Sequence, residues 1–457
     1  MDWIPTISDR SGPLYLRIVG ALSDDIAAGR LREGQVLPTH RTLAAALGID
    51  LTTVTRAYSE ARRLGLTDAR VGRGTFVKAG RDAQRRMSAV PAIDLSMNIP
   101  PQPPDADLSA RLAKAFGDVR AEAGLESYLN YQQPGGTRAE RALAADWLKF
   151  FVPNVEPERL AIAPGTQSAL FGLLMMLVPR GGAIFTEALT YPGLKGAAAA
   201  LGIRLVGVEM DAQGLDPDAL SRACREHPEV RAIYLMPTMH NPTTATLSPE
   251  RRERIVRIIR QNDLTLIEDD PYAFLTTGIV PFAAMMPERT HLAASLSKCV
   301  APGLRASIIV LPDKEVTARL VNSLRATLQM PAAFATAMAV RWLRDGTANA
   351  IIASVRAEAA ARQKLAREAL AGHVFAADPH GHHVWLPLPS TWSDARFAAQ
   401  LENRGLGVVA ADAFAVGEQS KGVRIALGAA RNRATLTRAL EIVRETLAAG
   451  SYDNQVV

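Results

Sequence analysis

The feature that most constrains the fold is a regular alternation of short apolar segments with amphipathic stretches of helical length, between residues 160 and 311. We expect strands at 160–163, 183–186, 204–208, 232–236, 264–268, 292–295 and 307–311, and helices at 166–178, 189–201, 216–226 and 248–262. This alternation predicts an α/β fold with a mostly parallel sheet, covered by helices on both faces. Residues 313–362 are helix-rich, and the tail from about residue 373 mixes short strands and helices, which predicts a smaller C-terminal α+β lobe.

The first 78 residues follow a different pattern. Apolar residues recur every four positions from 14 to 26, which predicts an amphipathic helix. A short second helix is expected over 41–47 and a third over 50–64, and two short strands are expected within 66–77. The order is that of a helix, a helix–turn–helix and a β-hairpin wing.

The chain therefore divides into a small head and a large body. We expect a DNA-binding domain at 1–78, a proline-rich linker and lead-in at 79–107, and the body at 108–457 with its small lobe from about 330 to 457. Residues 1–90 hold 14 Lys and Arg against 9 Asp and Glu, or +5 of the net +6. A basic head on a nearly neutral body favours a polyanionic partner, although a solvated basic surface would give the same excess.

Composition and segment lengths exclude several classes of protein. The longest strongly apolar stretch, Ala169–Val178, is ten residues, whereas a membrane span needs roughly 20. Residues 1–20 show no secretory signal, and two cysteines, Cys224 and Cys299, do not make a disulfide framework. We expect a soluble cytoplasmic protein that does not bind a membrane.

The head carries a motif as well as a pattern. Leu37–Ala44, Thr53–Val54, Ala57–Tyr58 and Gly72–Val77 together resemble the winged helix–turn–helix of GntR-type transcription regulators. The resemblance covers about residues 12–78 and implies that the third helix enters the major groove of double-stranded DNA.

The expected DNA contacts are five residues of the head. Thr52, Thr53 and Arg56 lie near the start of the third helix, where side chains face base edges. Arg41 and Arg73 are expected against phosphates. Regulators of this class often carry Ser or Thr and then Arg where this chain has Asp50 and Leu51, so the operator sequence does not follow from the resemblance.

The body contains a lysine motif. Ser295-Leu296-Ser297-Lys298, followed by Pro302-Gly303-Leu304-Arg305, resembles the motif of fold-type I enzymes that depend on pyridoxal 5'-phosphate. The resemblance implies that Lys298 condenses with the cofactor's aldehyde as a Schiff base, and that Ser295 and Arg305 bind its phosphate.

Further residues match the same family in chain order. Asp269 and Tyr272 fit its Asp-x-x-Tyr motif, in which the carboxylate pairs with the ring nitrogen and the phenol with the ring hydroxyl. Asn241, before a proline, resembles the asparagine that donates to the same hydroxyl. Tyr191 resembles the tyrosine that stacks on the ring.

The phosphate and the substrate have their own expected partners. Gly165, Thr166 and Gln167 lie between a strand and a helix, where free N–H groups bind anions. Tyr131 resembles the tyrosine that reaches the phosphate of the other subunit's cofactor. Arg424 resembles the arginine that holds a substrate carboxylate with two parallel hydrogen bonds.

A GntR-type head on an aminotransferase-like body resembles the MocR subgroup of bacterial regulators. The resemblance implies a homodimeric transcription factor that senses pyridoxal phosphate or an amino compound. Two alternatives are an active aminotransferase with an accessory head, and an amine sensor that does not bind DNA. The histidines at 380, 382 and 383 are interpreted as structural, because no Cys or carboxylate pattern of a metal site accompanies them.

Overall fold

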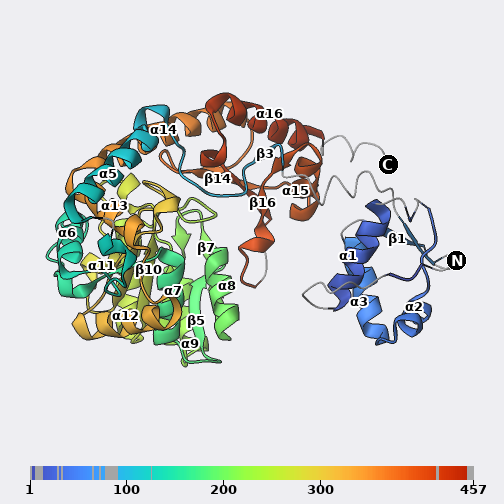
Figure 1. Ribbon diagram of the computed structural model, residues 1–457, viewed down its shortest axis with the longest axis horizontal. Helices are drawn as coiled ribbons and strands as arrows, with labels where there is room; N and C mark the ends of the chain where they lie inside the picture. Colours follow the sequence, from blue (N-terminus) through green and yellow to red (C-terminus); the bar gives the residue numbers. More distant parts are fainter. Residues whose placement is uncertain are drawn as a thin grey trace. The chain divides into compact units, whose positions relative to one another are not determined.

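The computed structural model describes residues 3–5, 14–27, 30–31, 34–63, 66–70, 74–77, 91–124, 126–417 and 421–449. The chain forms two compact units, residues 1–92 and residues 93–457 (Figure 1). The expected combination of a helix–turn–helix head with an α/β body is confirmed.

The N-terminal unit contains three helices, α1 (Leu14–Ala27), α2 (His40–Leu47) and α3 (Leu51–Arg63). The side-chain oxygen of Thr39 accepts a hydrogen bond from the Thr42 amide and so caps α2, and Gly48 ends this helix in the left-handed conformation at φ 64°. Asp50 caps α3 in the same way, through the Thr52 amide. These caps fix the short turn between α2 and α3.

The helices meet in a small apolar core. Leu22 of α1, Leu43 of α2 and Val54 of α3 are all buried in it. Ala57, Tyr58 and Ala61 of α3 are buried beside Val54, and the Tyr58 hydroxyl donates a hydrogen bond of 2.9 Å to the carbonyl of Pro38. The core therefore also anchors the segment before α2.

The wing is an antiparallel hairpin of β1 (Thr67–Arg70) and β2 (Gly74–Val77). Residues 34–37 add a further run of backbone hydrogen bonds to β2, among them the bond from the Leu37 amide to the Thr75 carbonyl. The sequence patterns did not predict this third partner. The expected phosphate contact Arg73 lies outside the described residues.

The body is built on a seven-stranded sheet with the order β4-β12-β11-β10-β9-β5-β6. Its strands are β4 (Leu160–Ala163), β5 (Ala183–Glu187), β6 (Arg204–Val208), β9 (Ala232–Leu235), β10 (Thr265–Asp270), β11 (Thr290–Ser295) and β12 (Ser307–Val310). All neighbouring pairs are parallel except those of β12, which runs antiparallel to β11 and β4. The predicted strands and the mostly parallel sheet are confirmed.

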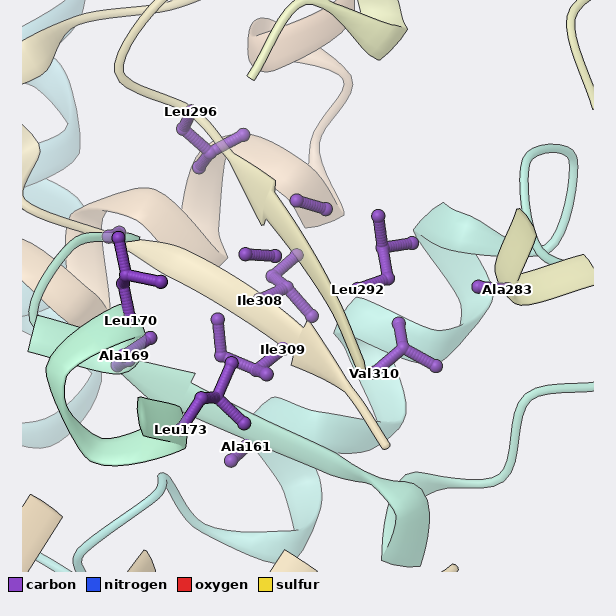
Figure 2. Close-up of a cluster of buried hydrophobic side chains, with 14 of the residues drawn as sticks. Ala161, Ala169, Leu170, Leu173, Ala283, Leu292, Leu296, Ile308, Ile309 and Val310 are labelled. Atoms are coloured by element: carbon purple, nitrogen blue, oxygen red, sulfur yellow. The ribbon is translucent and has the colours of Figure 1, made fainter. Parts of the chain in front are cut away.

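Helices cover both faces of this sheet, as the buried strands require (Figure 1). The predicted helices correspond to α7 (Thr166–Leu177), α8 (Pro192–Leu201), α9 (Pro217–Glu226) and α10 (Pro249–Gln261). Figure 2 shows Leu170 and Leu173 of α7 beside Ile308 and Ile309 of β12 in one buried cluster. Because α7 is held against the sheet, its N-terminus has a fixed place at the sheet's edge.

The C-terminal part of the body has its own antiparallel sheet, in the order β13-β14-β17-β16. The strands are β13 (Ala376–Ala377), β14 (His383–Pro387), β16 (Val409–Ala410) and β17 (Gly422–Ala426). The helices packed with them are α14 (Thr347–Ala369), α15 (Asp394–Asn403) and α16 (Arg433–Ala449). Helices α5 (Leu108–Ala123), α6 (Arg138–Leu148), α12 (Lys314–Leu328) and α13 (Ala333–Arg344) complete the body.

Residues 93–99, which we call the β3 segment, join this lobe at the start of the body. Strand β3 (Ile93–Asp94) pairs in parallel with β15 (Leu406–Gly407), and Leu95 is fully buried in the core of the lobe. A Cβ placed on Gly428 would lie 1.9 Å from the Ile99 carbonyl oxygen. Glycine at position 428 therefore permits the close approach that holds the β3 segment.

In the described part of the chain, no helix combines the length and the apolar character that crossing a bilayer requires.

Gly428→Ala should lower the free energy of unfolding by roughly 1–3 kcal/mol, because the methyl group would displace the Ile99 backbone. Gly196→Ala in α8 is the matched control, since nothing lies within 4 Å of its added Cβ. The free energy of unfolding of this control should rise by about 0.5–1 kcal/mol, because alanine is a better helix former than glycine. Urea denaturation followed by tryptophan fluorescence measures both changes, and equal stabilities of the two variants would contradict the proposed fit.

Candidate functional site

The carboxyl ends of the parallel strands lie on one side of the large sheet, and several of the predicted site residues lie at or just after those ends. Lys298 comes three residues after β11, is largely buried, and donates a hydrogen bond from Nζ to the carbonyl oxygen of Asn98. Burial, together with the positive charge of Arg424, lowers the pKa of Lys298 to about 8. The amine is therefore partly neutral, and so partly nucleophilic, near neutral pH.

Asp269 lies near the end of β10 and is 3% exposed. Its Oδ2 accepts a hydrogen bond of 2.7 Å from the Tyr234 hydroxyl, whereas its Oδ1 has no partner among the described residues. Burial raises the pKa of Asp269 to about 7, against the lowering effect of the Tyr234 hydrogen bond. A buried oxygen without a partner is the kind of acceptor that a ligand's N–H group satisfies.

The neighbouring carboxylates on β10 have different surroundings, because consecutive strand residues face opposite sides of a sheet. Glu268 accepts hydrogen bonds from two backbone amides and lies 3.6 Å from the Arg252 guanidinium. Asp270 accepts from Thr238, which also accepts from Arg252. The structure thus separates Asp269, which faces Lys298 and Tyr234, from two carboxylates that hold the sheet to α10.

Arg424 on β17 is 6% exposed and reaches the same group of residues. It donates from Nη1 to Asn241 Oδ1 over 2.8 Å and from Nη2 to the Ser96 carbonyl, and its Cζ lies 5.1 Å from the centre of the Phe414 ring. Its Nε has no partner among the described residues, and burial lowers the pKa of Arg424 to about 10. A buried guanidinium with an unused donor can bind a carboxylate.

The residues expected to bind an anion lie at the N-terminus of α7. Gly165 precedes this helix at φ 90°, and a Cβ there would lie 2.5 Å from Nη2 of Arg305. Thr166 Oγ1 lies 2.9 Å from the hydroxyl of Ser307, whose Oγ is also 3.5 Å from Ser295 Oγ. Helix N–H groups, hydroxyls and a guanidinium thus gather in one place, as an anion requires.

Two further predicted residues meet at α8, while a third lies elsewhere. Gln167 donates a hydrogen bond of 2.9 Å to the Gly193 carbonyl, and a Cβ on Gly193 would lie 2.2 Å from the Tyr191 ring. Gly193 thus leaves room for the ring at the start of α8. Tyr131 is 83% exposed, with its side chain directed to the surface of the chain.

Residues that the sequence analysis did not select complete the site. Asn98, from the range expected as a linker, contacts Lys298, Tyr272 and His383. His382 Nε2 lies 2.6 Å from the carbonyl of Lys298. Burial lowers the pKa of His382 to about 4 and that of His383 well below its usual value, so both imidazoles are neutral.

One of the missed residues carries a signal in the sequence. Tyr234 is a tyrosine within an otherwise aliphatic strand, and a buried hydroxyl usually has a partner. The sequence around Asn98 has no such signal, because it lies among prolines without periodicity.

In the N-terminal unit, the described DNA-contact residues lie on α2 and α3. Arg41, Thr52 and Arg56 are exposed, and Thr53 is half-buried. Thr52 hydrogen-bonds to Asp50, and the Arg56 guanidinium lies 4.5 Å from the centre of the Tyr15 ring. The first turns of α2 and α3 carry no acidic residue, although the carboxylate of Asp50 caps α3 directly beside Thr52.

Comparison with known proteins agrees with both units. Residues 90–443 match the profile of the family described as aminotransferase class I and II, and residues 14–77 match that of the bacterial regulatory proteins of the gntR family. Two aminotransferases share the fold at a TM-score of 0.73, an archaeal alanine:glyoxylate aminotransferase at 23% identity and the kynurenine aminotransferase of Pyrococcus horikoshii at 19%. Each comparison covers 81% of this chain and 94% of the other.

Relatives with both units are regulators by name. YdeF of Bacillus subtilis (strain 168), an HTH-type transcriptional regulator, is 29% identical over 98% of this chain and 97% of its own. PtsJ of Salmonella typhimurium (strain LT2), a vitamin B6 salvage pathway transcriptional repressor, is 28% identical over 93% and 96%. PdxR of Corynebacterium glutamicum, a pyridoxine biosynthesis transcriptional regulator, is 25% identical over 67% of each chain. The chain belongs to the aminotransferase class I and II family, and its GntR-type head places it among the MocR-type regulators.

Proposed function

We propose that this chain is a DNA-binding transcriptional regulator whose body binds pyridoxal 5'-phosphate at Lys298, and whose DNA affinity responds to that cofactor or to an amino compound. The observation that supports the proposal is the coexistence of two candidate sites in one chain. The head presents Arg41, Thr52 and Arg56 on helices without acidic first turns, and the body encloses Lys298 with Asp269. The names of PtsJ and PdxR support a vitamin B6 compound as the effector.

The residues present fit this cofactor. It combines an aldehyde, an anionic phosphate and a ring nitrogen, and when bound it supplies an electron sink. Lys298 offers a partly neutral amine for the aldehyde, and Arg305 with the α7 N-terminus offers an anion site. The free Oδ1 of Asp269 would accept a hydrogen bond from the ring nitrogen.

The chain's own residues would then determine what else binds. Arg424 would donate hydrogen bonds to the carboxylate of an amino acid, which would replace the carbonyl of Ser96 as its acceptor. Neutral His382 and His383 close the other side of the site with hydrogen bonds to backbone carbonyls. An amine with a carboxylate is therefore distinguished from one without by a single buried guanidinium.

We also propose that the regulator is a homodimer. The exposed Tyr131 supports the expectation that it reaches the cofactor phosphate of the partner subunit. Two heads in one dimer would match two operator half-sites.

An aminotransferase activity is the second candidate, and the intact set of Lys298, Asp269 and Arg424 favours it. The experiment that separates the two functions is a gel shift on the DNA upstream of the chain's own gene, with and without pyridoxal phosphate. A regulator binds that DNA specifically with an affinity that depends on the cofactor. An enzyme with an accessory head instead converts amino acids to 2-oxo acids and shows no cofactor-dependent binding.

The rate at which the cofactor-free protein binds pyridoxal phosphate should depend on pH through Lys298. The neutral amine is the reactive form, so the rate should rise about tenfold per pH unit up to about pH 8 and level off above it. Stopped-flow absorbance measures the rate, and borohydride reduction followed by peptide mapping should locate the pyridoxyl group on Lys298. A rate still rising at pH 10, or an adduct on another lysine, would contradict the assignment.

Arg56→Ala should weaken operator binding by roughly 1–3 kcal/mol and relax the preference at one base pair, as expected of a base-reading arginine. Arg41→Ala should weaken operator and random DNA alike and reduce the salt dependence, as expected of a phosphate contact. Fluorescence anisotropy on both DNAs at several salt concentrations compares the variants. Equal losses on the two DNAs for Arg56→Ala would exclude base reading.

Replacing Arg424 by Gln should abolish the response of DNA binding to an α-amino acid but not to the amine formed from it by decarboxylation. The reason is that only the amino acid has a carboxylate to exchange for the Ser96 carbonyl. DNA-binding titrations against such pairs of compounds provide the measurement, with the amine as the internal control. An unchanged response to the amino acid would mean that the effector does not use Arg424.

A further inference from the structure

Asn98 lies between three hydrogen-bonding groups of the site. Its backbone carbonyl accepts from Lys298 Nζ, and its side-chain Nδ2 lies 2.7 Å from the Tyr272 hydroxyl and 3.0 Å from Nδ1 of His383. Asn98 is 5% exposed, and Leu95 anchors the β3 segment that carries it. The position of the amide is therefore fixed by the fold of the C-terminal lobe.

The direction of each hydrogen bond follows from the far side of His383. Nε2 of this histidine lies 3.1 Å from the carbonyl oxygen of His240, which only accepts, so Nε2 carries the proton. The neutral ring then has a lone pair on Nδ1, which requires a donor. The NH₂ group of Asn98 is that donor, which fixes the orientation of the whole amide.

The second hydrogen of the same NH₂ group points at Tyr272. An amide nitrogen does not accept hydrogen bonds, so the Tyr272 oxygen is the acceptor and its own proton must lie in another direction. In the described part of the chain, no acceptor receives this proton. Tyr272 is 1% exposed, so solvent does not receive the proton either, and it remains available to a ligand.

A second donor is oriented in the same manner. Arg424 donates to Oδ1 of Asn241 over 2.8 Å, which leaves the NH₂ group of Asn241 to point away from the guanidinium. We propose that Asn98 is a positioning residue that directs the Tyr272 hydroxyl proton toward the bound ligand, so that Tyr272 and Asn241 both present donors to a ligand oxygen. This inference rests on the proposed binding of pyridoxal phosphate.

The consequence is electrostatic. Two donors on one oxygen favour its ionised form, more so in a site from which water is excluded. The cofactor's visible absorbance changes when the group that includes its ring hydroxyl gains or loses a proton. The pH midpoint of that change therefore reports how strongly the two donors stabilise the ionised oxygen. Loss of one donated hydrogen bond should raise the midpoint by about one pH unit.

The test uses the cofactor-loaded full-length protein. Asn98→Ala releases the hydroxyl of Tyr272 and should raise the absorbance midpoint by about one unit. Asn98→Asp keeps the side-chain volume but replaces a donor by an acceptor that takes the Tyr272 proton, so the midpoint should rise further. Both variants keep the backbone carbonyl that contacts Lys298. Asn349→Asp, an exposed residue on α14, adds the same charge and should leave the midpoint unchanged.

A double-mutant comparison separates positioning from a general structural effect. Tyr272→Phe should itself raise the midpoint, and Asn98→Ala should add nothing in that background, because Asn98 acts through the hydroxyl. An equal shift in both backgrounds, or an unchanged midpoint in both Asn98 variants, would overturn the inference while leaving cofactor binding intact. A wild-type protein without a titrating cofactor band would overturn the proposed function, and this inference with it.

Discussion

The interaction on which the site depends is the enclosure of two cations, Lys298 and Arg424, beside a buried carboxylate. Burial lowers the pKa of both cations, and the positive charge of Arg424 adds to the lowering at Lys298. Asp269 opposes this effect at Lys298 but is itself held partly protonated by burial. Lys298 and Asp269 are therefore both close to titration near neutral pH, whereas Arg424 stays charged, so a bound anion would change the protonation of the first two.

The fold supplies this enclosure from two lobes. The large sheet brings Asp269 and Lys298 to one edge, because parallel strands end there, whereas Arg424 comes from the antiparallel sheet of the C-terminal lobe. The β3 segment belongs to that second lobe by its pairing with β15, yet its carbonyls contact both cations. It also directly follows residue 92, where the N-terminal unit ends. A ligand that replaced these carbonyls as hydrogen-bond partners would change the contacts of the first residues of the body.

The sequence predicted most of the fold and the residues of the site with strong local motifs. Helical and strand periods are local, and Lys298, Asp269 and Arg424 stand in recognisable strings of residues. The role of the β3 segment was not predictable, because its structure depends on pairing with Leu406–Gly407, far along the chain. The Asp-x-x-Tyr spacing selected Asp269 rather than Asp270, and the alternation along β10 explains why Asp269 lies beside Tyr234 whereas Asp270 bonds to Thr238.

The three histidines near the site have neutral imidazole rings, and this protonation state determines the hydrogen bonds around them. His240, His382 and His383 are buried, and burial lowers the pKa of each well below its usual value. A charged imidazole would add repulsion to two cations that are already close together, whereas a neutral one has one donor and one acceptor. That single acceptor on His383 orients Asn98, and Asn98 in turn orients Tyr272. The same desolvation that depresses the pKa of Lys298 thus also fixes the direction of the hydrogen bonds around it.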